Sequence, residues 1–157
     1  MLQSIASWFK IDTASAHCDI PCGVYDPSAA AYQARAVLAL TKKIIELTIP
    51  KDNATDEEMR ALHCTTSRMV QAKETAAQQC KQELLILWTD YFKPQHLQLF
   101  PDLHDTFWNA AKLCSFTKQN VDSEKAEELQ ETVAKVAGMF AEAEAQKSKP
   151  MASVGKR

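Results

Sequence analysis

TDEEMRALHCTTSRMVQAKETAAQQCKQELLILWTDYFKP, residues 55–94, is the longest continuous helical pattern in the chain. It begins with Thr55 and Glu58, which have the spacing of a helix capping box. A stripe of mostly apolar side chains follows at helical intervals, and we expect it to lie in the core: Met59, Leu62, Thr66, Met69, Ala76, Cys80, Leu84, Leu87 and Tyr91. The pattern stops at Lys93-Pro94, because proline does not continue a helix. These features predict one long helix of roughly 50 Å, at 1.5 Å per residue.

Three other segments have the same kind of periodicity. The first runs from about residue 28 to residue 48 and follows Asp26-Pro27, a helix-start signal with Asp as the cap and Pro in the first turn. The other two begin near Pro101 and at Asp122. Their apolar stripes are, in order, Val37, Leu40, Ile44 and Leu47; Leu103, Phe107, Ala110 and Leu113; and Ala126, Leu129, Val133, Val136, Phe140 and Ala143. Four such helices with short connections predict an all-α protein, an up-down-up-down four-helix bundle.

The composition favours a single helical domain. Of the 157 residues, 46% are hydrophobic, 24% are charged and only 3 are Gly, which argues against an all-β fold. The formal net charge is −2 without a long basic run, so we expect no nucleic-acid partner. No apolar run is long enough to span a bilayer, so we expect no membrane insertion. The 5 Cys are an odd number and the N-terminus is a poor signal peptide, so we expect a cytoplasmic protein with free thiols.

The two ends of the chain differ from the helical region. Within residues 1–16 the only basic residue follows the apolar stretch, and Ala14-Ser15-Ala16 is a small-residue run of the kind that peptidases accept. We therefore expect either a frayed terminus or a removable leader, whose cleavage would make His17 the first residue. Residues 146–157 lack periodicity, and we expect a disordered tail. The domain itself is then residues 17–145.

Residues 17–22, HCDIPC, concentrate metal-binding groups ahead of the first helix. Two thiols with nitrogen donors suit soft or borderline metals, and a structural zinc site would need a second pair of ligands, which the other histidines do not supply at a recognisable spacing. If the chain begins at His17, its α-amine, the amide nitrogen and thiolate of Cys18, and the thiolate of Cys22 form a flat N₂S₂ set. The His17 imidazole is then available as an axial ligand. This metal-binding hook favours Ni(II) or Cu(II), and its anionic donors stabilise a higher oxidation state.

Two motifs resemble those of one known family. HCDIPCGVYDP, residues 17–27, is similar to the nickel hook of the nickel superoxide dismutases, and LWTDYFKP, residues 87–94, is similar to the end of that family's second helix. The resemblance spans residues 17 to about 145. It implies conversion of superoxide to O₂ and H₂O₂ by Ni(II)/Ni(III) cycling, with one nickel ion per chain, in a homohexamer of four-helix bundles. It also implies a maturation peptidase that removes residues 1–16.

The resemblance further assigns roles to single residues. Nickel would be held by the amine and imidazole of His17, the amide nitrogen and thiolate of Cys18, and the thiolate of Cys22. His17 and Tyr25 would have the catalytic roles, and Tyr25 resembles the family's gate residue, which restricts access to small anions. Supporting roles would fall to Asp19 (stabilising the hook), Pro21 (the family's cis-proline, which reverses the chain), Gln33 (beside the imidazole) and Lys93 (positive potential for an anionic substrate).

The chain departs from the family at one pair of positions. The family often has a Glu that hydrogen-bonds the axial imidazole and pairs with an Arg on the second helix, whereas this chain has Gln33 and Ala76. Gln33 still offers an amide oxygen, but without a negative charge. Since outer partners set the basicity of a ligand, this exchange affects the axial ligand and the redox tuning.

From the residues alone, three functions stay open: a nickel enzyme, a nickel carrier, and an oligomer scaffold with an oxidised disulfide hook. The carrier has no need of Tyr25 or of an N-terminal amine that stabilises Ni(III), whereas the enzyme requires that amine. We expect the remaining aromatic and histidine residues to be structural. Trp88, Tyr91 and Phe92 would then lie in the core or an interface, and His96 and His104 at the surface or an interface.

Overall fold

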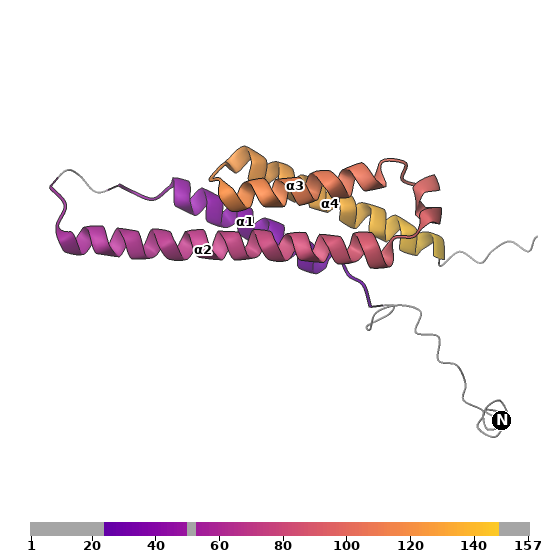
Figure 1. Ribbon diagram of the computed structural model, residues 1–157, viewed down its shortest axis with the longest axis horizontal. Coiled ribbons are helices and arrows are strands. Elements are labelled where there is room, and N and C mark those ends of the chain that lie inside the picture. Colours follow the sequence, from indigo (N-terminus) through magenta and orange to yellow (C-terminus); the bar gives the residue numbers. More distant parts are fainter. Residues whose placement is uncertain (1–23, 50–52, 148–157) are drawn as a thin grey trace, which may run out of the picture.

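The computed structural model describes residues 24–49 and 53–147. Its four main helices are α1 (Ser28–Ile45), α2 (Asp56–Ile86), α3 (Leu103–Gln119) and α4 (Ser123–Lys147), and they run in alternating directions (Figure 1). α1 packs on α2 and α4, and α3 packs on the same two helices. No strand occurs among the described residues. The predicted all-α four-helix bundle is therefore confirmed.

The hook (residues 17–22) and the leader (residues 1–16) lie outside the described residues, as do residues 148–157 of the tail. α4 continues to Lys147, slightly beyond the predicted domain boundary at residue 145. None of the helices within residues 24–49 and 53–147 combines the length and the apolar character that a bilayer span requires.

The predicted starts of α1 and α2 are confirmed by their side chains. The Asp26 carboxylate accepts the backbone N–H and the hydroxyl of Ser28, each at 2.8 Å. At α2, the Thr55 hydroxyl accepts the Glu58 N–H at 3.3 Å, and the Glu58 carboxylate accepts the Thr55 N–H at 2.8 Å. These bonds satisfy N–H groups that have no partner within a helix.

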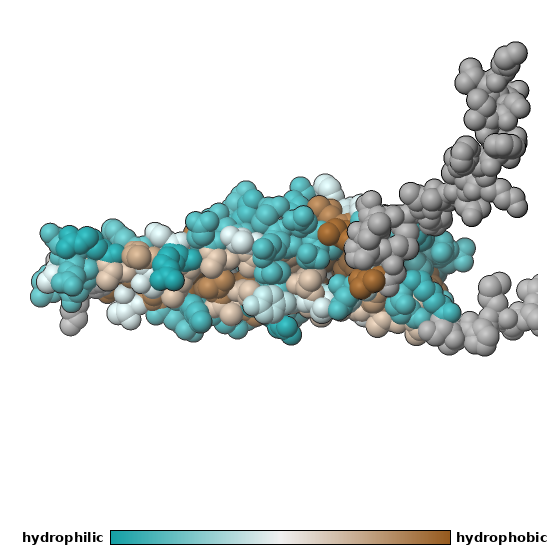
Figure 2. Space-filling view, turned by 90° about the horizontal axis from the view of Figure 1, so that it is seen from below, coloured by the Kyte–Doolittle hydropathy of each residue, from teal (hydrophilic) through white to brown (hydrophobic). Residues whose placement is uncertain are grey.

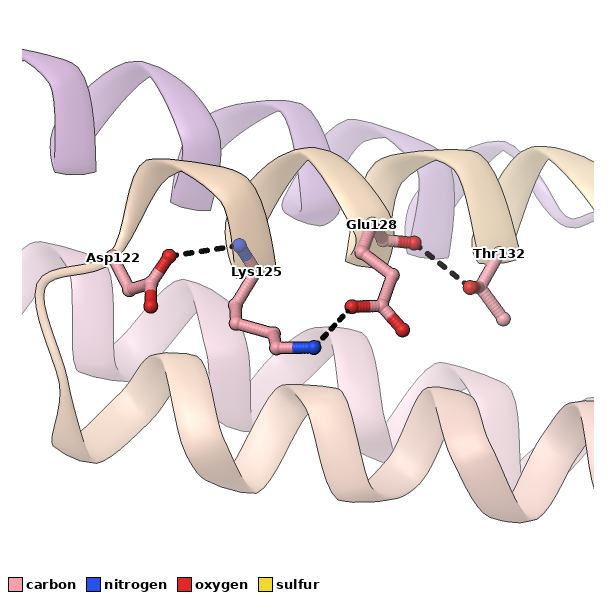
Figure 3. Close-up of polar contacts among 4 residues, drawn as sticks. All are labelled: Asp122, Lys125, Glu128 and Thr132. Atoms are coloured by element: carbon pink, nitrogen blue, oxygen red, sulfur yellow. Dashed lines mark hydrogen bonds and ion pairs between the residues drawn. The ribbon is translucent and has the colours of Figure 1, made fainter.

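The start of α4 is held in the same way (Figure 3). The Asp122 carboxylate accepts the Lys125 backbone N–H at 3.0 Å, and the Lys125 ammonium lies 2.6 Å from Glu128 Oε2. One turn further, the Thr132 hydroxyl donates to the Glu128 carbonyl at 2.8 Å. The predicted opening at Asp122 is confirmed. Its ion pair is exposed and contributes little to stability.

Two short helical turns between α2 and α3 were not predicted from the sequence. The first, η1 (Leu87–Tyr91), is a π-helical turn closed by a 3.1 Å hydrogen bond from the Phe92 N–H to the Leu87 carbonyl. The second, η2 (Pro94–Gln98), is a 3₁₀ helix. Together they carry the chain across one end of the bundle (Figure 1). Single π turns are frequent at functional sites, which directs attention to this end.

The core lies between the four helices, and it confirms most of the predicted stripes. All predicted positions of α3 and α4 are buried except Phe140, which is half-buried. In α1 the buried residues are Ala30, Ala34, Val37 and Thr41, so only Val37 of the predicted stripe is buried. The stripe prediction is wrong there because small residues, rather than large apolar ones, form the face of α1 that meets its neighbours.

The first half of α2 is also less buried than predicted. Its buried residues begin only at Lys73, and Met59 is 37% exposed. Leu62 and Met69 are half-buried. In Figure 1 this half of α2 extends past the turn between α3 and α4, and past the end of α1. The predicted core stripe is therefore wrong for this half, since α3 and α4 do not reach it.

Lys73 is the least expected residue of the core, because it is 1% exposed. Its ammonium donates hydrogen bonds to the backbone carbonyls of Thr117, Lys118 (3.1 Å) and Asn120 (2.9 Å). These carbonyls lie at the C-terminal end of α3, where a helix leaves its carbonyls without internal partners. Lys73 therefore ties the middle of α2 to the turn that joins α3 to α4.

Candidate metal centre

The end of the bundle where α1 begins differs in surface character from the rest. On the face shown in Figure 2, hydrophilic residues cover most of the helices, and strongly apolar residues gather toward this end. Val24, which is 72% exposed, lies here just ahead of α1. The described part of the chain begins at this point, shortly after the predicted hook. We call it the hook end.

The structure brings the two family-like motifs together at the hook end. Tyr25, from the first motif, is half-buried and packs edge-on against Tyr91, from the second, with 5.8 Å between ring centroids. Tyr91 closes the π-helical turn η1 and is only 5% exposed. Segments more than sixty residues apart, 25–27 and 87–94, thus share one end of the fold. The predicted gate residue therefore rests on the second motif.

Tyr91 is the centre of a group of rings that we call the aromatic cluster: Tyr25, Tyr91, Phe92, His96 and Phe140. The Tyr91 ring lies 4.4 Å from Phe140, 4.9 Å from Phe92 and 5.9 Å from His96, measured between centroids. The cluster joins the segment just before α1, η1 and the residue that follows it, η2, and the last part of α4. It confirms that Tyr91 and Phe92 lie in the core, while Trp88 is half-buried beside Phe107.

One carboxylate and one ammonium complete the cluster. The Tyr91 hydroxyl donates to Glu144 Oε1 at 2.6 Å, and the Lys147 ammonium donates to the same oxygen at 2.5 Å. Lys147 also lies 4.4 Å from the centroid of the Tyr91 ring. The hydrogen bond from Lys147, followed by that from Tyr91, holds the pKa of Glu144 below its usual value, so this side chain is a carboxylate at neutral pH. Burial, with the Glu144 hydrogen bond, raises the pKa of Tyr91 and keeps it a phenol.

His96 is placed differently from the prediction. It is 7% exposed, and its Nδ1 accepts the backbone N–H of Lys93 at 3.0 Å. Burial, with the neighbouring Lys147, lowers the pKa of His96 and favours the neutral ring. The prediction of a surface or interface position is wrong for His96, because η2 folds this histidine back against Tyr91. His104 is exposed, as predicted.

The predicted supporting residues lie at separate places. Lys93 is exposed between η1 and η2, next to the aromatic cluster. Gln33 is half-buried in α1, and Ala76 is buried in α2, the helix that packs against α1. Asp19 and Pro21 lie outside the described residues.

The predicted nickel ligands, His17, Cys18 and Cys22, also lie outside the described residues. Within residues 24–49 and 53–147, no three His, Cys, Asp or Glu side chains are grouped so that they could hold a metal ion. The donors of the hook nevertheless fit nickel by their chemistry, because an amine, an amide nitrogen and two thiolates make the tetragonal set that Ni(II) favours.

A four-helix bundle that is preceded in the sequence by two thiols and an imidazole is typical of a helical-bundle metalloprotein. The family model of the nickel-containing superoxide dismutases matches residues 12–144, a stretch that includes the predicted hook. The chain therefore belongs to the nickel-containing superoxide dismutase family. Membership confirms the resemblance found in the sequence, and with it the predicted nickel cofactor and enzyme class.

Similar proteins agree with this assignment. A protein of Streptomyces seoulensis named nickel superoxide dismutase is 36% identical over 126 residues, which cover 80% of this chain and 86% of that protein. A protein of the same name from Streptomyces coelicolor is 34% identical over 128 residues, covering 82% and 88%. A native nickel superoxide dismutase structure superposes with a TM-score of 0.67 at 30% identity, over 82% of this chain and 99% of the other. A structure with the nickel ligation of the oxidised state gives 0.68 at 33% identity, with the same coverage.

Glu144 and Lys147 were not predicted from the sequence. The sequence did contain one signal for Glu144. An acidic residue in the last turn of a helix interacts unfavourably with the helix dipole, which suggests that it has a specific contact. The run AEAEAQK, residues 141–147, reads instead as an ordinary solvated helix end. Only the packing of α4 beside η1 shows that Glu144 meets Tyr91.

Proposed function

We propose that this protein converts two superoxide anions and two protons to O₂ and H₂O₂ at a nickel ion held by His17, Cys18 and Cys22. One observation carries the proposal: Tyr25, three residues after Cys22, packs on Tyr91 of the second family motif. The segment that follows the hook thus starts from a fixed platform at the hook end. When bound, nickel supplies one-electron exchange between Ni(II) and Ni(III).

The residues of the hook have separate tasks in this proposal. Removal of residues 1–16 frees the amine of His17, which joins the amide nitrogen and thiolate of Cys18 and the thiolate of Cys22. The His17 imidazole would be a further nickel ligand. Two thiolates and an amide anion favour the higher oxidation state, so the donor set itself tunes the ion toward redox work.

Tyr25 acts as the gate. Its ring is half-buried and braced by Tyr91, so it excludes bulky molecules from the approach to the hook while a small anion passes. Burial and Glu144 keep Tyr91 a neutral phenol, so no phenolate repels the substrate there. Lys93, exposed beside the cluster, contributes positive potential that attracts an anion.

The remaining tasks are supporting ones. Asp19 would stabilise the hook, Pro21 would reverse the chain so that Cys22 could bind nickel, and Gln33 would accept a hydrogen bond from the His17 imidazole. Because Gln33 is uncharged, it makes the imidazole less basic than a carboxylate would.

We further propose that the mature protein is a cytoplasmic homohexamer of chains that begin at His17, with one nickel ion per chain. A dedicated peptidase removes the leader, residues 1–16. These points rest on the resemblance of the sequence to the family and on the small-residue run at Ala14-Ser15-Ala16.

The proposal is tested with protein beginning at His17. Cys18→Ser and Cys22→Ser each remove one thiolate, and Cys64→Ser, an exposed residue of α2, is the matched control. We expect the control and the wild type to bind one nickel per chain and to consume superoxide, while the two hook variants lose dismutation and keep the helical content of the bundle.

Full dismutation by either hook variant would contradict the ligand assignment. One nickel per chain without dismutation in the wild type would favour a nickel carrier. A hook disulfide that excludes nickel would favour the scaffold. The experiment therefore separates the three functions that the residues alone leave open.

A further inference from the structure

Two side chains of the last turn of α4, Glu144 and Lys147, reach the aromatic cluster, and Glu144 does so by a hydrogen bond. Tyr91 is 5% exposed, so its hydroxyl must find a partner inside the protein, and that partner is the Glu144 carboxylate at 2.6 Å. A charge-assisted bond of this length is among the stronger hydrogen bonds of proteins. The phenol end of Tyr91 is thus fixed to α4, while its ring carries the edge of Tyr25.

We infer that Glu144 is a positioning residue for the gate: it holds the Tyr91 ring on which Tyr25 rests, and so couples the end of α4 to the segment that follows the hook. The inference rests on the proposed function of Tyr25. Glu144 touches neither substrate nor metal in this scheme. It acts through Tyr91.

The stability of α4 gives no reason for a carboxylate at this position. Negative charge in the last turn of a helix opposes the helix dipole. The Lys147–Glu144 pair is about half exposed and contributes little by itself. What distinguishes Glu144 from Glu142, an exposed residue on the same turn, is the buried phenol at its tip.

Lys147 makes the carboxylate compatible with an anionic substrate. Its ammonium lies 2.5 Å from Glu144 Oε1 and 4.4 Å from the Tyr91 ring centroid, so the charges cancel beside the cluster. An unpaired carboxylate at the hook end would repel superoxide. The pair therefore supplies a strong acceptor for Tyr91 without a net negative charge.

Three variants test the inference: Glu144→Ala, Glu144→Gln and the control Glu142→Ala. Two quantities are measured. The first is kcat/KM for superoxide with nickel-loaded protein beginning at His17, and the second is the set of NMR contacts between the ring protons of Tyr25 and Tyr91 in the full chain without nickel. Far-ultraviolet circular dichroism shows whether each variant keeps its helices.

We expect Glu144→Ala to lower kcat/KM about tenfold, the lower end of what loss of outer partners costs a metal site, and to weaken the Tyr25–Tyr91 contacts. Glu144→Gln keeps an acceptor oxygen and restores both quantities. Glu142→Ala behaves as the wild type. Rescue by Gln separates positioning from a simple loss of packing.

An active wild type whose rate and ring contacts are unchanged by Glu144→Ala would overturn the inference, as would lost contacts with an unchanged rate. A wild type without dismutation would overturn the proposed function, and the role of Tyr25 with it. In that case the NMR contacts still show whether Glu144 holds the two rings together, so the two failures are distinguishable.

Discussion

The hook end and the turn between α3 and α4 are held together in different ways. At the hook end, ring contacts and one phenol–carboxylate bond join the segment before α1, η1 and α4 around Tyr91. At the turn, which we call the turn end, the buried ammonium of Lys73 binds three backbone carbonyls. At the hook end Tyr25 and Phe140 are half-buried, whereas at the turn end Lys73 is 1% exposed. Stability and chemistry are therefore assigned to different ends of one bundle.

The magnitudes agree with this division. An aromatic pair is worth about 0.5–1.5 kcal/mol beyond its buried area, and several weak contacts tolerate small shifts. Leaving buried hydrogen-bonding groups unsatisfied costs about 1–3 kcal/mol for each. Changes at the turn end should thus lower the free energy of unfolding, while changes at the hook end should mainly lower activity.

The largest expected effect comes from removing residues 1–23, so that the chain begins at Val24. All nickel-dependent dismutation should disappear, because every proposed ligand is lost. The unfolding midpoint should move by no more than about 4 °C, the effect of roughly 1 kcal/mol in a domain of this size. Superoxide decay and thermal unfolding followed by circular dichroism check this. Unfolding of the shortened chain would show that the two ends are not independent.

Lys73→Met tests the turn end. Methionine fills a similar volume but leaves the carbonyls of Thr117, Lys118 and Asn120 without their donor, so the free energy of unfolding should fall by about 3 kcal/mol. Urea unfolding measures the change, and activity per folded, nickel-loaded molecule should stay unchanged. Lys118→Met is the control, since that ammonium makes one exposed bond of 3.3 Å to Gln78. Equal destabilisation by both variants would contradict the special role of Lys73.

Gln33→Glu, in α1, tests whether a charge near the hook end changes the redox potential of the proposed nickel site. It adds a half-buried carboxylate near the predicted axial ligand, with no Arg at position 76 to pair it. The imidazole should become more basic, so the nickel midpoint potential should fall and kcat/KM should change by at most about tenfold. Electrochemistry of nickel-loaded protein measures the potential. Gln79→Glu, an exposed position of α2, should leave it unchanged, and an equal shift there would contradict a local effect.

The smallest effect is a pH dependence from Glu144. Its pKa is held below the usual 4.5 by the hydrogen bonds from Lys147 and Tyr91, so the folded state binds this proton less readily than the unfolded state. The stability that Glu144 contributes is therefore fully present above about pH 4.5. It is lost as the pH falls from there through the lowered pKa of the folded state. Urea unfolding measures the free energy of unfolding of the wild type and of Glu144→Gln at pH 7 and pH 3.5. The difference between the two proteins should be smaller at pH 3.5. A larger difference at pH 3.5 than at pH 7 would contradict the predicted direction of the pH dependence.

Much of the bundle could be predicted from sequence because its signals are local. The capping pairs Asp26–Ser28 and Thr55–Glu58, and the stripes of α3 and α4, depend on neighbours within a turn or two. The face of α1 was misjudged because close helix packing selected Ala30 and Ala34, which carry little hydrophobic signal. The stripe of Met59 and Met69 was misjudged because α3 and α4 stop short of it.

The candidate site shows the same difference between local signals, which could be predicted, and contacts between distant segments, which could not. The hook donors and Tyr25 were predicted because they fall within one short motif. Glu144, Lys147 and the buried position of His96 were not predicted, since their contacts join α4, η1 and η2, which are far apart in sequence. Lys73 was passed over because a lysine on an apolar stripe gives no sign, in sequence alone, that carbonyls of another helix surround it.

The most direct test follows superoxide decay with three nickel-treated proteins: the chain beginning at His17, the chain beginning at Ala16, and the full chain. The Ala16 form differs by one residue and blocks the proposed amine ligand. Fast decay by the His17 form alone is the predicted result, because only that form offers the His17 amine. Equal decay by the Ala16 form or the full chain would contradict a nickel site built on the new N-terminus.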